Sequence, residues 1–230
     1  EVSRLDVGVP VAVMTYVNLV YRFGYRRFAE RAADAGVSGV ILPDLPLEEA
    51  EEWCAAADEA GVDMILVGDS VAMVVLGYDD TLQVTVEDLA HHTAAVARAK
   101  PSALIVGDLP WMSYHVSAAE TVRNAAMLVR AGAQCVKLEG GRKRVPMIEA
   151  LVDAEIPVMG HLGLTPQSMH AMGGFKVQAR ESEAALQLVA DAKALQHAGC
   201  FAIVLEGVPD EVAAMVTDAL DVPTIGIGAG

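Results

Sequence analysis

Residues 64–70 read MILVGDS, in which four apolar residues run directly into Gly68, Asp69 and Ser70. An apolar run that does not alternate with polar residues is typical of a strand buried on both faces, as in a parallel sheet. A buried strand commonly ends in a turn residue, so Asp69 could be a turn former. It could also be a chemical group held at the mouth of a site, and the rest of the sequence bears on that choice.

The same pattern recurs along the whole chain. Each short apolar run is followed by a polar or Gly-containing loop and then by an Ala-rich amphipathic segment, which predicts seven helices between eight strands. This alternation predicts a (β/α)8 TIM barrel of eight parallel strands, with an open doubly wound sheet as the alternative. No linker divides residues 1–230. The runs are VAVMTY (11–16), VILPD (40–44), MILVGD (64–69), ALIVGD (103–108), CVKLEG (135–140), PVMGH (157–161), AIVLEG (202–207) and TIGIGAG (224–230).

The last apolar run leads straight to Gly230. We therefore expect a barrel whose closing C-terminal helix is missing. The surface left open by that helix would be apolar, and exposed apolar patches usually find partners. Self-association through this surface is the corresponding expectation.

Composition narrows the classes of partner. The formal net charge of −15 argues against binding to nucleic acid and to anionic membrane surfaces, which both need a basic patch. A signal-peptide pattern and an apolar run of membrane-spanning length are both absent, so we expect a soluble protein. Cys54, Cys135 and Cys200 lie far apart without a C-x-x-C pair, which is typical of reduced, buried thiols in a cytoplasmic protein.

Titratable side chains gather at the carboxyl ends of the expected strands, where (β/α)8 barrels carry their active sites. Any one acidic residue there could be a helix N-cap or turn former. Five strands ending in a carboxylate are harder to explain in that way, because clustered carboxylates repel unless protons or a cation neutralise them. Lys137 and Glu139 are two apart on one strand and should point to the same side. The strand-end residues are Asp44, Asp69, Asp108, Glu139, His161 and Glu206.

Chemical roles follow from residue type. Asp69 and Asp108 are the leading ligand candidates for a hard divalent cation such as Mg²⁺, which prefers oxygen ligands. Glu206 lies among apolar residues in IVLEGVP and could act as a general base, or be a carboxylate in water at a strand end. His161 could donate a hydrogen bond to a substrate oxygen, or be a packed structural histidine.

A family resemblance covers the chain from about residue 57 to residue 230. The segment closely resembles ketopantoate hydroxymethyltransferase (3-methyl-2-oxobutanoate hydroxymethyltransferase), a (β/α)8 barrel of pantothenate biosynthesis. The resemblance implies Mg²⁺-dependent transfer of a hydroxymethyl group from methylene-tetrahydrofolate to 2-ketoisovalerate. The stretches that carry it, in order, are MILVGDS, LGYDDTLQVTVEDLAHHTAAV, LIVGDLPWMSY, RAGAQCVKLEGG, PVMGHLGLTPQSMHAMGGFKVQ, LEGVP and PTIGIGAG.

The resemblance also implies a role for each site residue. A metal chelated by the α-keto acid would stabilise the enolate that the base generates. Ala179 and Glu181 depart from the family, which tends to have glycine at both positions. The implied metal ligands are Asp69 and Asp108 with Glu139 nearby; the implied substrate-binding set is Ser70, Asp69, Asp108, Lys137 and His161; and the implied catalytic base is Glu206.

The first quarter of the chain resembles a different family. Residues from about 9 to 55 are similar to the tryptophan synthase α subunit, through PVAVMTY, VILPDLP and the acidic helix start that follows. The α subunit's catalytic carboxylates and phosphate-binding loops would lie on segments absent here, so indole-glycerol-phosphate cleavage is not expected. Two strands of one barrel joined near residue 56 to six of another predict an engineered chimera, with an unusual natural fusion as the alternative.

The splice leaves two functional expectations open. The chain could be a chimeric scaffold that carries an inherited transferase site with little or no turnover, because the transferase's own first strand is replaced. It could instead retain metal-dependent hydroxymethyl transfer, or at least its enolisation half, because the strand-end residues are intact. A misplacement of about 1 Å in such a site can cost roughly 10²-fold in rate.

Overall fold

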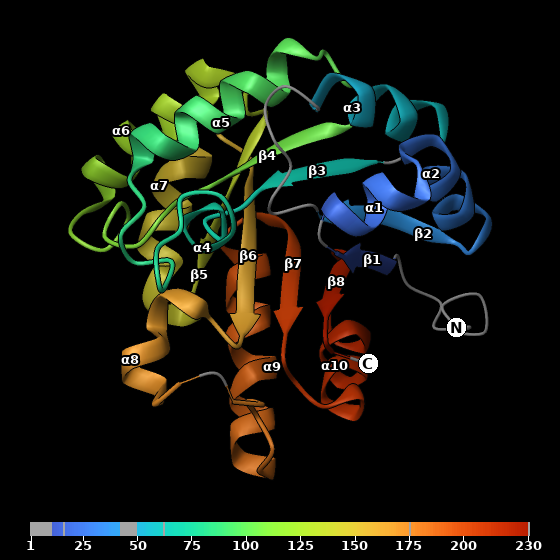
Figure 1. Cartoon of the computed structure of the whole chain (residues 1–230). Helices are drawn as coiled ribbons and strands as arrows, with labels where there is room; N and C mark the ends of the chain where they lie inside the picture. The colour runs from blue at the N-terminus through green and yellow to red at the C-terminus, as the bar shows by residue number, and fades with distance from the viewer. Residues whose placement is uncertain (1–10, 16, 42–49, 62, 175, 230) are drawn as a thin grey trace.

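The computed structural model describes residues 11–15, 17–41, 50–61, 63–174 and 176–229. Within these residues, parallel strands are flanked by helices on one face (Figure 1). Every described strand overlaps one of the eight apolar runs, although β2 begins three residues before its run. The strands are β1 (Val11–Met14), β2 (Val37–Ile41), β3 (Met64–Val67), β4 (Leu104–Asp108), β5 (Cys135–Glu139), β6 (Val158–Gly163), β7 (Cys200–Glu206) and β8 (Thr224–Ile227).

The helical layer contains more pieces than the sequence pattern predicts. One helix was expected between the first two strands, but the chain forms two, separated by Gly24 at φ 91°. That backbone conformation favours glycine and ends the first helix. The helices are α1 (Val17–Phe23), α2 (Tyr25–Asp34), α3 (Ala50–Glu59), α4 (Val71–Val74), α5 (Val86–Arg98), α6 (Ala118–Ala131), α7 (Val145–Asp153), α8 (Met169–Met172), α9 (Ser182–His197) and α10 (Asp210–Asp218), with 3-10 turns η2 (Arg142–Arg144) and η3 (Pro166–Ser168).

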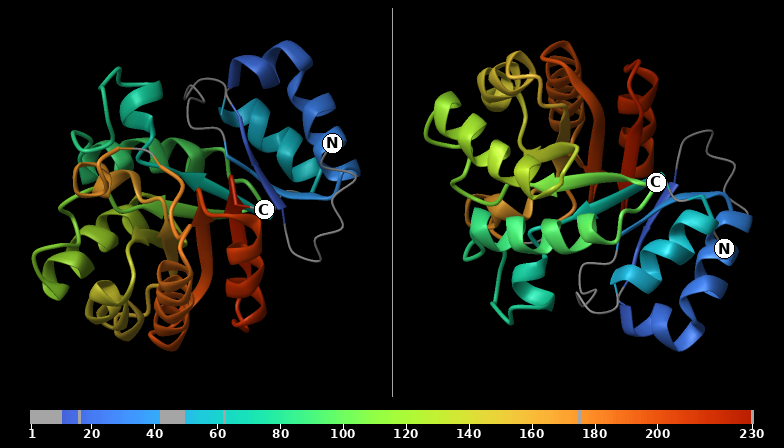
Figure 2. Two further views of the ribbon diagram at one scale, coloured as in Figure 1. Left: turned by 90° about the horizontal axis from the view of Figure 1, so that it is seen from below. Right: turned by 90° about the horizontal axis from the view of Figure 1, so that it is seen from above.

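The strands form two hydrogen-bonded sheets. Strands β3 to β8 pair in chain order as one parallel six-stranded sheet, and β1 pairs with β2 in a separate parallel ladder. In the part of the chain that the structure describes, no ladder joins the two sheets, although β2 lies beside β3 and β1 beside β8. Figure 2 shows the smaller sheet and its helices to one side of the larger one. The parallel α/β fold is confirmed, whereas closure into one eight-stranded barrel stays a prediction.

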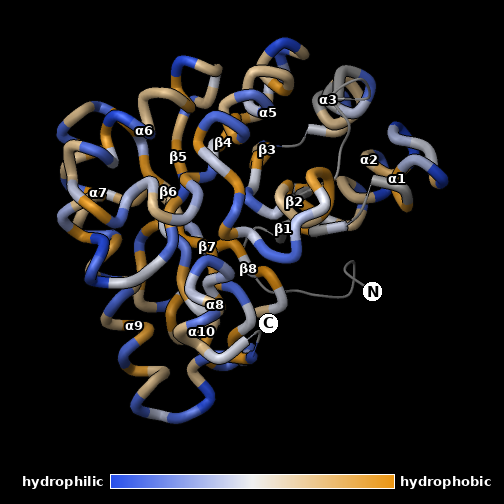
Figure 3. The backbone as a smooth tube through the Cα atoms, turned by 60° about the vertical axis from the view of Figure 1, so that its left-hand side comes forward, coloured by the Kyte–Doolittle hydropathy of each residue, from blue (hydrophilic) through white to orange (hydrophobic). Residues whose placement is uncertain are grey.

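Two apolar layers pack on opposite faces of the larger sheet. The outer layer joins strand residues such as Ile105, Val136 and Ile203 to the helices α5, α6, α7, α9 and α10. The inner layer contains strand residues alone, with Val106 and Met159 among them. Because side chains alternate along a strand, both faces of a strand can be apolar only when its apolar run is continuous. Figure 3 shows hydrophobic residues along these strands.

The smaller sheet is attached to the larger one by an aromatic core. Trp53 of α3 is 2% exposed and packs edge-on against Tyr25 and beside Phe28, both on α2. The same core includes Ile65 of β3 and Ala103, which directly precedes β4. Helix α3 therefore packs against elements of both sheets. Among the described residues, no helix is both long and apolar enough to span a bilayer.

Candidate active site

The site continues the inward-facing rows of the larger sheet. Along β4, Val106 belongs to the inner apolar layer and Asp108 follows two residues later on the same side. The same two-residue step leads from Cys135 to Lys137 and Glu139, from Met159 to His161, and from Val204 to Glu206. The residues toward the amino ends of these strands therefore form the inner apolar layer, and the residues at their carboxyl ends carry charged groups.

Asp69, Asp108 and Lys137 form one half of the cluster. The Asp69 backbone N–H donates to Asp108 Oδ2 at 3.0 Å, and Lys137 Nζ lies 2.8 Å from Asp108 Oδ1. Burial and the nearby Asp108 raise the pKa of Asp69 well above its ordinary value, and burial likewise raises the pKa of Asp108. Burial acts to lower the pKa of Lys137, but Asp108 and Glu139 outweigh it, so that pKa is raised and the ammonium stays charged.

Glu139, His161 and Glu206 form the other half. Glu139 Oε1 lies 3.2 Å from His161 Nδ1 and 3.8 Å from Lys137 Nζ, and His161 Nε2 lies 3.2 Å from Glu206 Oε2. Burial and Lys137 act to lower the pKa of His161, but the carboxylates on its two edges raise it to about 9. Burial would raise the pKa of Glu139, but His161 lowers it below its ordinary value. A raised pKa favours the imidazolium form, which would lie between two carboxylates, while Lys137 Nζ lies 3.4 Å from the same Nδ1.

Two residues that sequence reasoning missed connect these halves. Gln167 of η3 donates from Nε2 to Asp69 Oδ2 at 2.9 Å, and its backbone N–H donates to Glu139 Oε2 at 3.1 Å. Tyr114, in the loop after β4, donates from its hydroxyl to Gln167 Oε1 at 2.5 Å. Both residues lie in loops after strand carboxyl ends, within the stretches LIVGDLPWMSY and PVMGHLGLTPQSMH. That position was the only signal in the sequence that could have found them.

The remaining predicted site residues have less defined places. Ser70 immediately precedes α4, at the same end of the sheet as Asp69. Its Oγ lies close to Gly68, because a Cβ added to that glycine would be only 3.3 Å from it. Asp44 lies outside the described residues. Ala179, one of the two departures from glycine, adopts φ 55° in the left-handed region.

The metal prediction stays a prediction, although the chemistry of two of its three residues fits a cation. Among the described residues, no group of three or more His, Cys, Asp or Glu side chains has an arrangement that could hold a metal ion. Asp69 and Asp108 nevertheless form a buried pair whose pKa values are raised mainly by burial, and a cation would favour the charged form of both carboxyls. Mg²⁺ commonly uses only one or two carboxylates and keeps several waters, so this pair fits it. Glu139 is instead engaged by His161 and Gln167.

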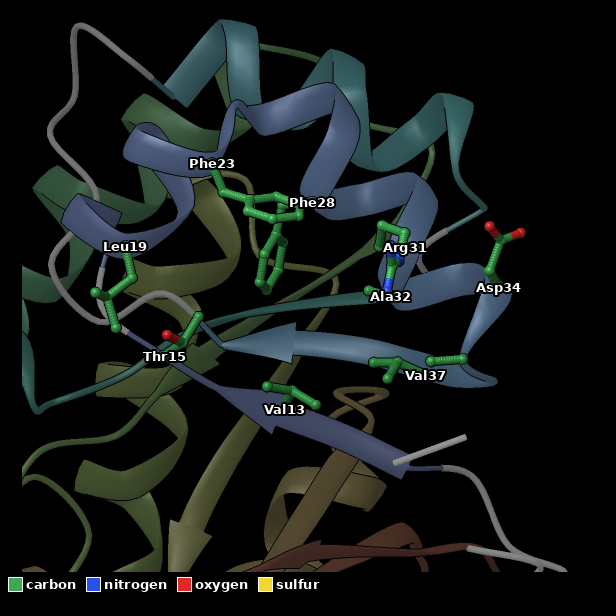
Figure 4. A pocket seen from close by; sticks show the side chains of 10 residues that line it. Val13, Thr15, Leu19, Phe23, Phe28, Arg31, Ala32, Asp34 and Val37 are labelled. Carbon is green, nitrogen blue, oxygen red and sulfur yellow. The ribbon is translucent and has the colours of Figure 1, made fainter. Parts of the chain in front are cut away.

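A pocket of about 610 Å³ lies elsewhere, between the smaller sheet and its helices (Figure 4). Val13 and Val37 contribute its sheet side, and Leu19, Phe23 and Phe28 contribute its helical side. Of the strand-end charged residues that the structure describes, none lines it. We place the candidate chemistry at the strand ends and not in this pocket, because the convergent titratable groups are there.

Sequence comparison places the chain that carries this ion network in a family. The family model of ketopantoate hydroxymethyltransferase matches residues 50–230, which include all strands of the larger sheet. The chain belongs to the ketopantoate hydroxymethyltransferase family. The model of the tryptophan synthase alpha chain matches residues 1–73, so the two matches overlap at residues 50–73. That overlap contains α3, whose side chains pack against both sheets.

Two relatives illustrate the extent of the match. The 3-methyl-2-oxobutanoate hydroxymethyltransferase of Syntrophobacter fumaroxidans is 60% identical over 175 residues, covering 76% of this chain and 62% of the relative. The protein of the same name from Ignicoccus hospitalis is 62% identical over 173 residues, covering 75% of this chain and 66% of the relative. The chain thus spans less than two thirds of the length of these relatives.

Solved structures of low sequence identity share the fold. A putative lyase/mutase from Burkholderia cenocepacia J2315 superposes with a TM-score of 0.61 at 18% identity, covering 89% of this chain and 82% of that protein. A 2,3-dimethylmalate lyase of the PEP mutase/isocitrate lyase superfamily superposes with a TM-score of 0.55 at 16% identity, covering 96% and 75%. At these identities the likeness supports the fold alone.

Proposed function

We propose that this site removes the C3 proton of 3-methyl-2-oxobutanoate, the enolisation half of hydroxymethyl transfer. The observation that carries the proposal is the position of Glu206 in the ion network. Its side chain is 20% exposed and lies against His161 Nε2, whereas the Asp108 and Glu139 side chains are only 1% and 2% exposed. Among the described strand-end carboxylates, which include Asp69 at 5% exposed, Glu206 is thus the most accessible, and a base must reach the proton that it abstracts.

The chain's own residues supply the rest of the half-reaction. Glu206 takes the C3 proton, the C–H electrons form the C2–C3 double bond, and negative charge develops on the C2 oxygen. Lys137 and Ser70 bind the anionic oxo acid, since a cation and a hydroxyl suit its carboxylate and keto oxygens. A magnesium ion held by Asp69 and Asp108 would supply further positive charge for the enolate oxygen. Because Glu206 reaches solvent, its proton can exchange with bulk water.

Complete transfer makes a further demand. The enolate must meet methylene-tetrahydrofolate, and the rate of such a bimolecular step depends on holding both reactants within about 1 Å of the productive geometry. The smaller sheet has no ladder to β3 or β8 among the described residues. We therefore propose that the chain is a barrel scaffold with an enolising site and little or no complete turnover. Full hydroxymethyl transfer to the oxo acid is the alternative.

We also propose a chimeric origin for the chain, with its join inside the overlap at residues 50–73. The two family models and the two separate ladders support this proposal. Helix α3 is the natural position for the join, because Trp53 packs with Tyr25 on one side while the same core reaches Ile65 on the other.

Proton NMR in D₂O tests the enolisation step. The protein is incubated with 3-methyl-2-oxobutanoate and Mg²⁺, and loss of the C3 proton signal is followed together with the protein's methyl region. We expect protein-dependent exchange that Glu206→Gln abolishes. Glu211→Gln, at an exposed position in the first turn of α10, is the matched control and should exchange at the unaltered rate. Equal exchange by Glu206→Gln and the unaltered protein would contradict the assignment of the base.

Adding methylene-tetrahydrofolate separates the two alternatives. Accumulation of hydroxymethylated oxo acid well above the rate in buffer would establish full transfer and overturn the scaffold proposal. C3 exchange without that product would support a site restricted to the first half-reaction. Well-dispersed protein methyl signals without exchange would contradict both.

A further inference from the structure

Gln167 makes more contacts within the ion network than the proposed proton abstraction requires. It is 5% exposed, and both its side chain and its backbone are bonded inside the site. Nε2 donates to Asp69 Oδ2 at 2.9 Å and to the carbonyl oxygen of Leu109 at 3.0 Å. Oε1 accepts from Tyr114, and the backbone N–H donates to Glu139 Oε2. An amide with two donors and one acceptor in use has a single fixed orientation.

These bonds span the sheet from one half of the site to the other. Asp69 follows β3, Leu109 follows β4 and Glu139 ends β5, yet all three are bound by one residue from the loop after β6. Glu139 Oε2 is taken by Gln167, and its other oxygen, Oε1, lies toward His161 and Lys137. The backbone of Gln167 thus decides which carboxylate oxygen faces the cations.

Tyr114 fixes the amide in turn. Its hydroxyl donates to Gln167 Oε1 and accepts from the Glu139 backbone N–H at 3.2 Å. The hydroxyl has one proton, so a bond to Oε1 commits that proton and prevents the amide from turning over. Burial raises the pKa of Tyr114 well above its ordinary value, which keeps the proton in place. The resulting path is Glu139 N–H to Tyr114 O–H to Gln167 amide to Asp69.

We propose that Gln167 is a positioning residue that orients Asp69 and Glu139 for the enolisation reaction, and that Tyr114 acts through it. This inference rests on the proposed function for its catalytic consequence and on the observed contacts for its structural one. Removing a residue that orients a metal-ligand side chain through a hydrogen bond typically lowers metal affinity or activity by about 10–100-fold. Loss of the side-chain amide would leave Asp69 without its neutral donor while Lys137 and Glu206 remain in place.

The variants are Gln167→Met, which keeps the length of the side chain, and Tyr114→Phe, which keeps the ring. The matched control is Gln196→Met. Gln196 also bonds through both ends of its amide, to the Asp221 carboxylate and to the backbone N–H groups of Asp221 and Val222, but it lies on α9 and bonds to the segment that precedes β8, outside the strand-end network. The Gln196→Met variant therefore measures how much stability the protein loses when a bridging glutamine outside the site is removed.

The kinetic readout is C3 exchange, resolved into kcat and KM. We expect Gln167→Met to lower kcat about 10–100-fold and to change KM less than about threefold, because Lys137 and Ser70 still bind the oxo acid. Tyr114→Phe should lower kcat in the same direction, and the double variant should be no slower than Gln167→Met, because the two residues act in series. Gln196→Met should lower the melting temperature and leave kcat unchanged. A kcat for Gln167→Met equal to that of Gln196→Met would overturn the proposal.

A second readout does not depend on enolisation. The carboxyl ¹³C resonance of Asp69, assigned by its disappearance in Asp69→Asn, should shift in Gln167→Met and in Tyr114→Phe and stay in place in Gln196→Met. If the unaltered protein shows no C3 exchange, the proposed function fails, but this resonance still tests the positioning contact. An Asp69 resonance unmoved by Gln167→Met in a folded protein would overturn the inference in either case.

Discussion

Gly163 lies so close to the backbone of Glu206 that no side chain fits between them. The two residues are register partners at the ends of β6 and β7, and the Leu164 N–H donates to the Glu206 carbonyl oxygen at 2.7 Å. A Cβ on Gly163 would lie closer than 3.0 Å to that carbonyl oxygen and to Val208. Gly163 also has φ 90°, a conformation that side chains disfavour. The candidate base therefore depends on a glycine on the neighbouring strand.

Gly163→Ala is expected to destabilise the fold and displace Glu206. The left-handed backbone costs about 1–2 kcal/mol for a non-glycine residue, and the clash with a backbone oxygen adds about 1–3 kcal/mol. Denaturant unfolding measures the loss of stability, and C3 exchange measures the displacement of Glu206. Gly174→Ala is the control, because Gly174 has φ 101° and nothing within 4 Å of a Cβ. It should show only the backbone cost, and equal losses in both variants would disprove the clash.

Ala179→Gly is expected to stabilise the protein. Ala179 has φ 55°, so its Cβ is strained by about 1–2 kcal/mol, of which glycine's extra chain entropy offsets about 0.5–1 kcal/mol. The net gain of about 0.5–1 kcal/mol should raise the melting temperature by about 1–4 °C for a chain of this size. Ala214→Gly, at an exposed helical position in α10, should lower stability by about 1 kcal/mol. A fall in melting temperature for Ala179→Gly would contradict the strain argument.

Stability should fall between about pH 6.5 and pH 9 through His161. Its folded pKa of about 9 lies above the ordinary 6.5, so its contribution is complete below pH 6.5 and is lost as pH rises through the folded value. The contribution is on the order of 3 kcal/mol, at 1.36 kcal/mol for each unit of pKa. Unfolding measured in a chelating buffer should show this decline in the unaltered protein.

His161→Gln isolates that contribution from the buried carboxylates, whose raised pKa values also reduce stability as pH rises. The decline over this range should be smaller in His161→Gln than in the unaltered protein. His170→Gln, at an exposed position on α8, should retain the full decline. The same slope in both variants would show that His161 is not a cation in the folded state.

The strand-end residues were predictable because two periodicities act together. A continuous apolar run locates a buried strand, and the two-residue alternation then indicates which side Lys137, Glu139 and their neighbours share. The structure brings Asp69, Asp108, Lys137, Glu139, His161 and Glu206 into one network, and their metal, substrate and base roles stay predictions.

Other features depend on contacts that no local pattern encodes. Gln167 lies in the three-residue 3-10 turn η3 and Tyr114 in an irregular loop, where neither the helical nor the strand period can be recognised, and their partners are distant in the chain. The division into two ladders depends on how β2 and β3 approach each other, while apolar runs specify strands and not their pairing. Helix α1 is too short for a clear amphipathic period and depends on Gly24 for its end.

The ion pair of Lys137 and Asp108 predicts how much the Lys137 ammonium contributes to the stability of the fold. Both side chains are at least 95% buried, and Asp69 and Glu139 share the same ammonium electrostatically. Removing one member of a buried pair leaves an uncompensated charge, at a cost of about 3–5 kcal/mol, whereas removing both can be nearly neutral. Lys137→Met should therefore be strongly destabilising in a chelating buffer, and Lys137→Met combined with Asp108→Asn should recover part of that loss.

A double-mutant cycle in denaturant measures this coupling. The single variants and the double variant are unfolded at one pH, and the cost of the double variant is expected to be below the sum of the two singles by about 1–3 kcal/mol. Addition of Mg²⁺ should stabilise Lys137→Met more than the double variant, because only the single variant keeps both Asp69 and Asp108 as carboxylates. Additive costs together with equal responses to Mg²⁺ would show that Lys137 does not neutralise this pair.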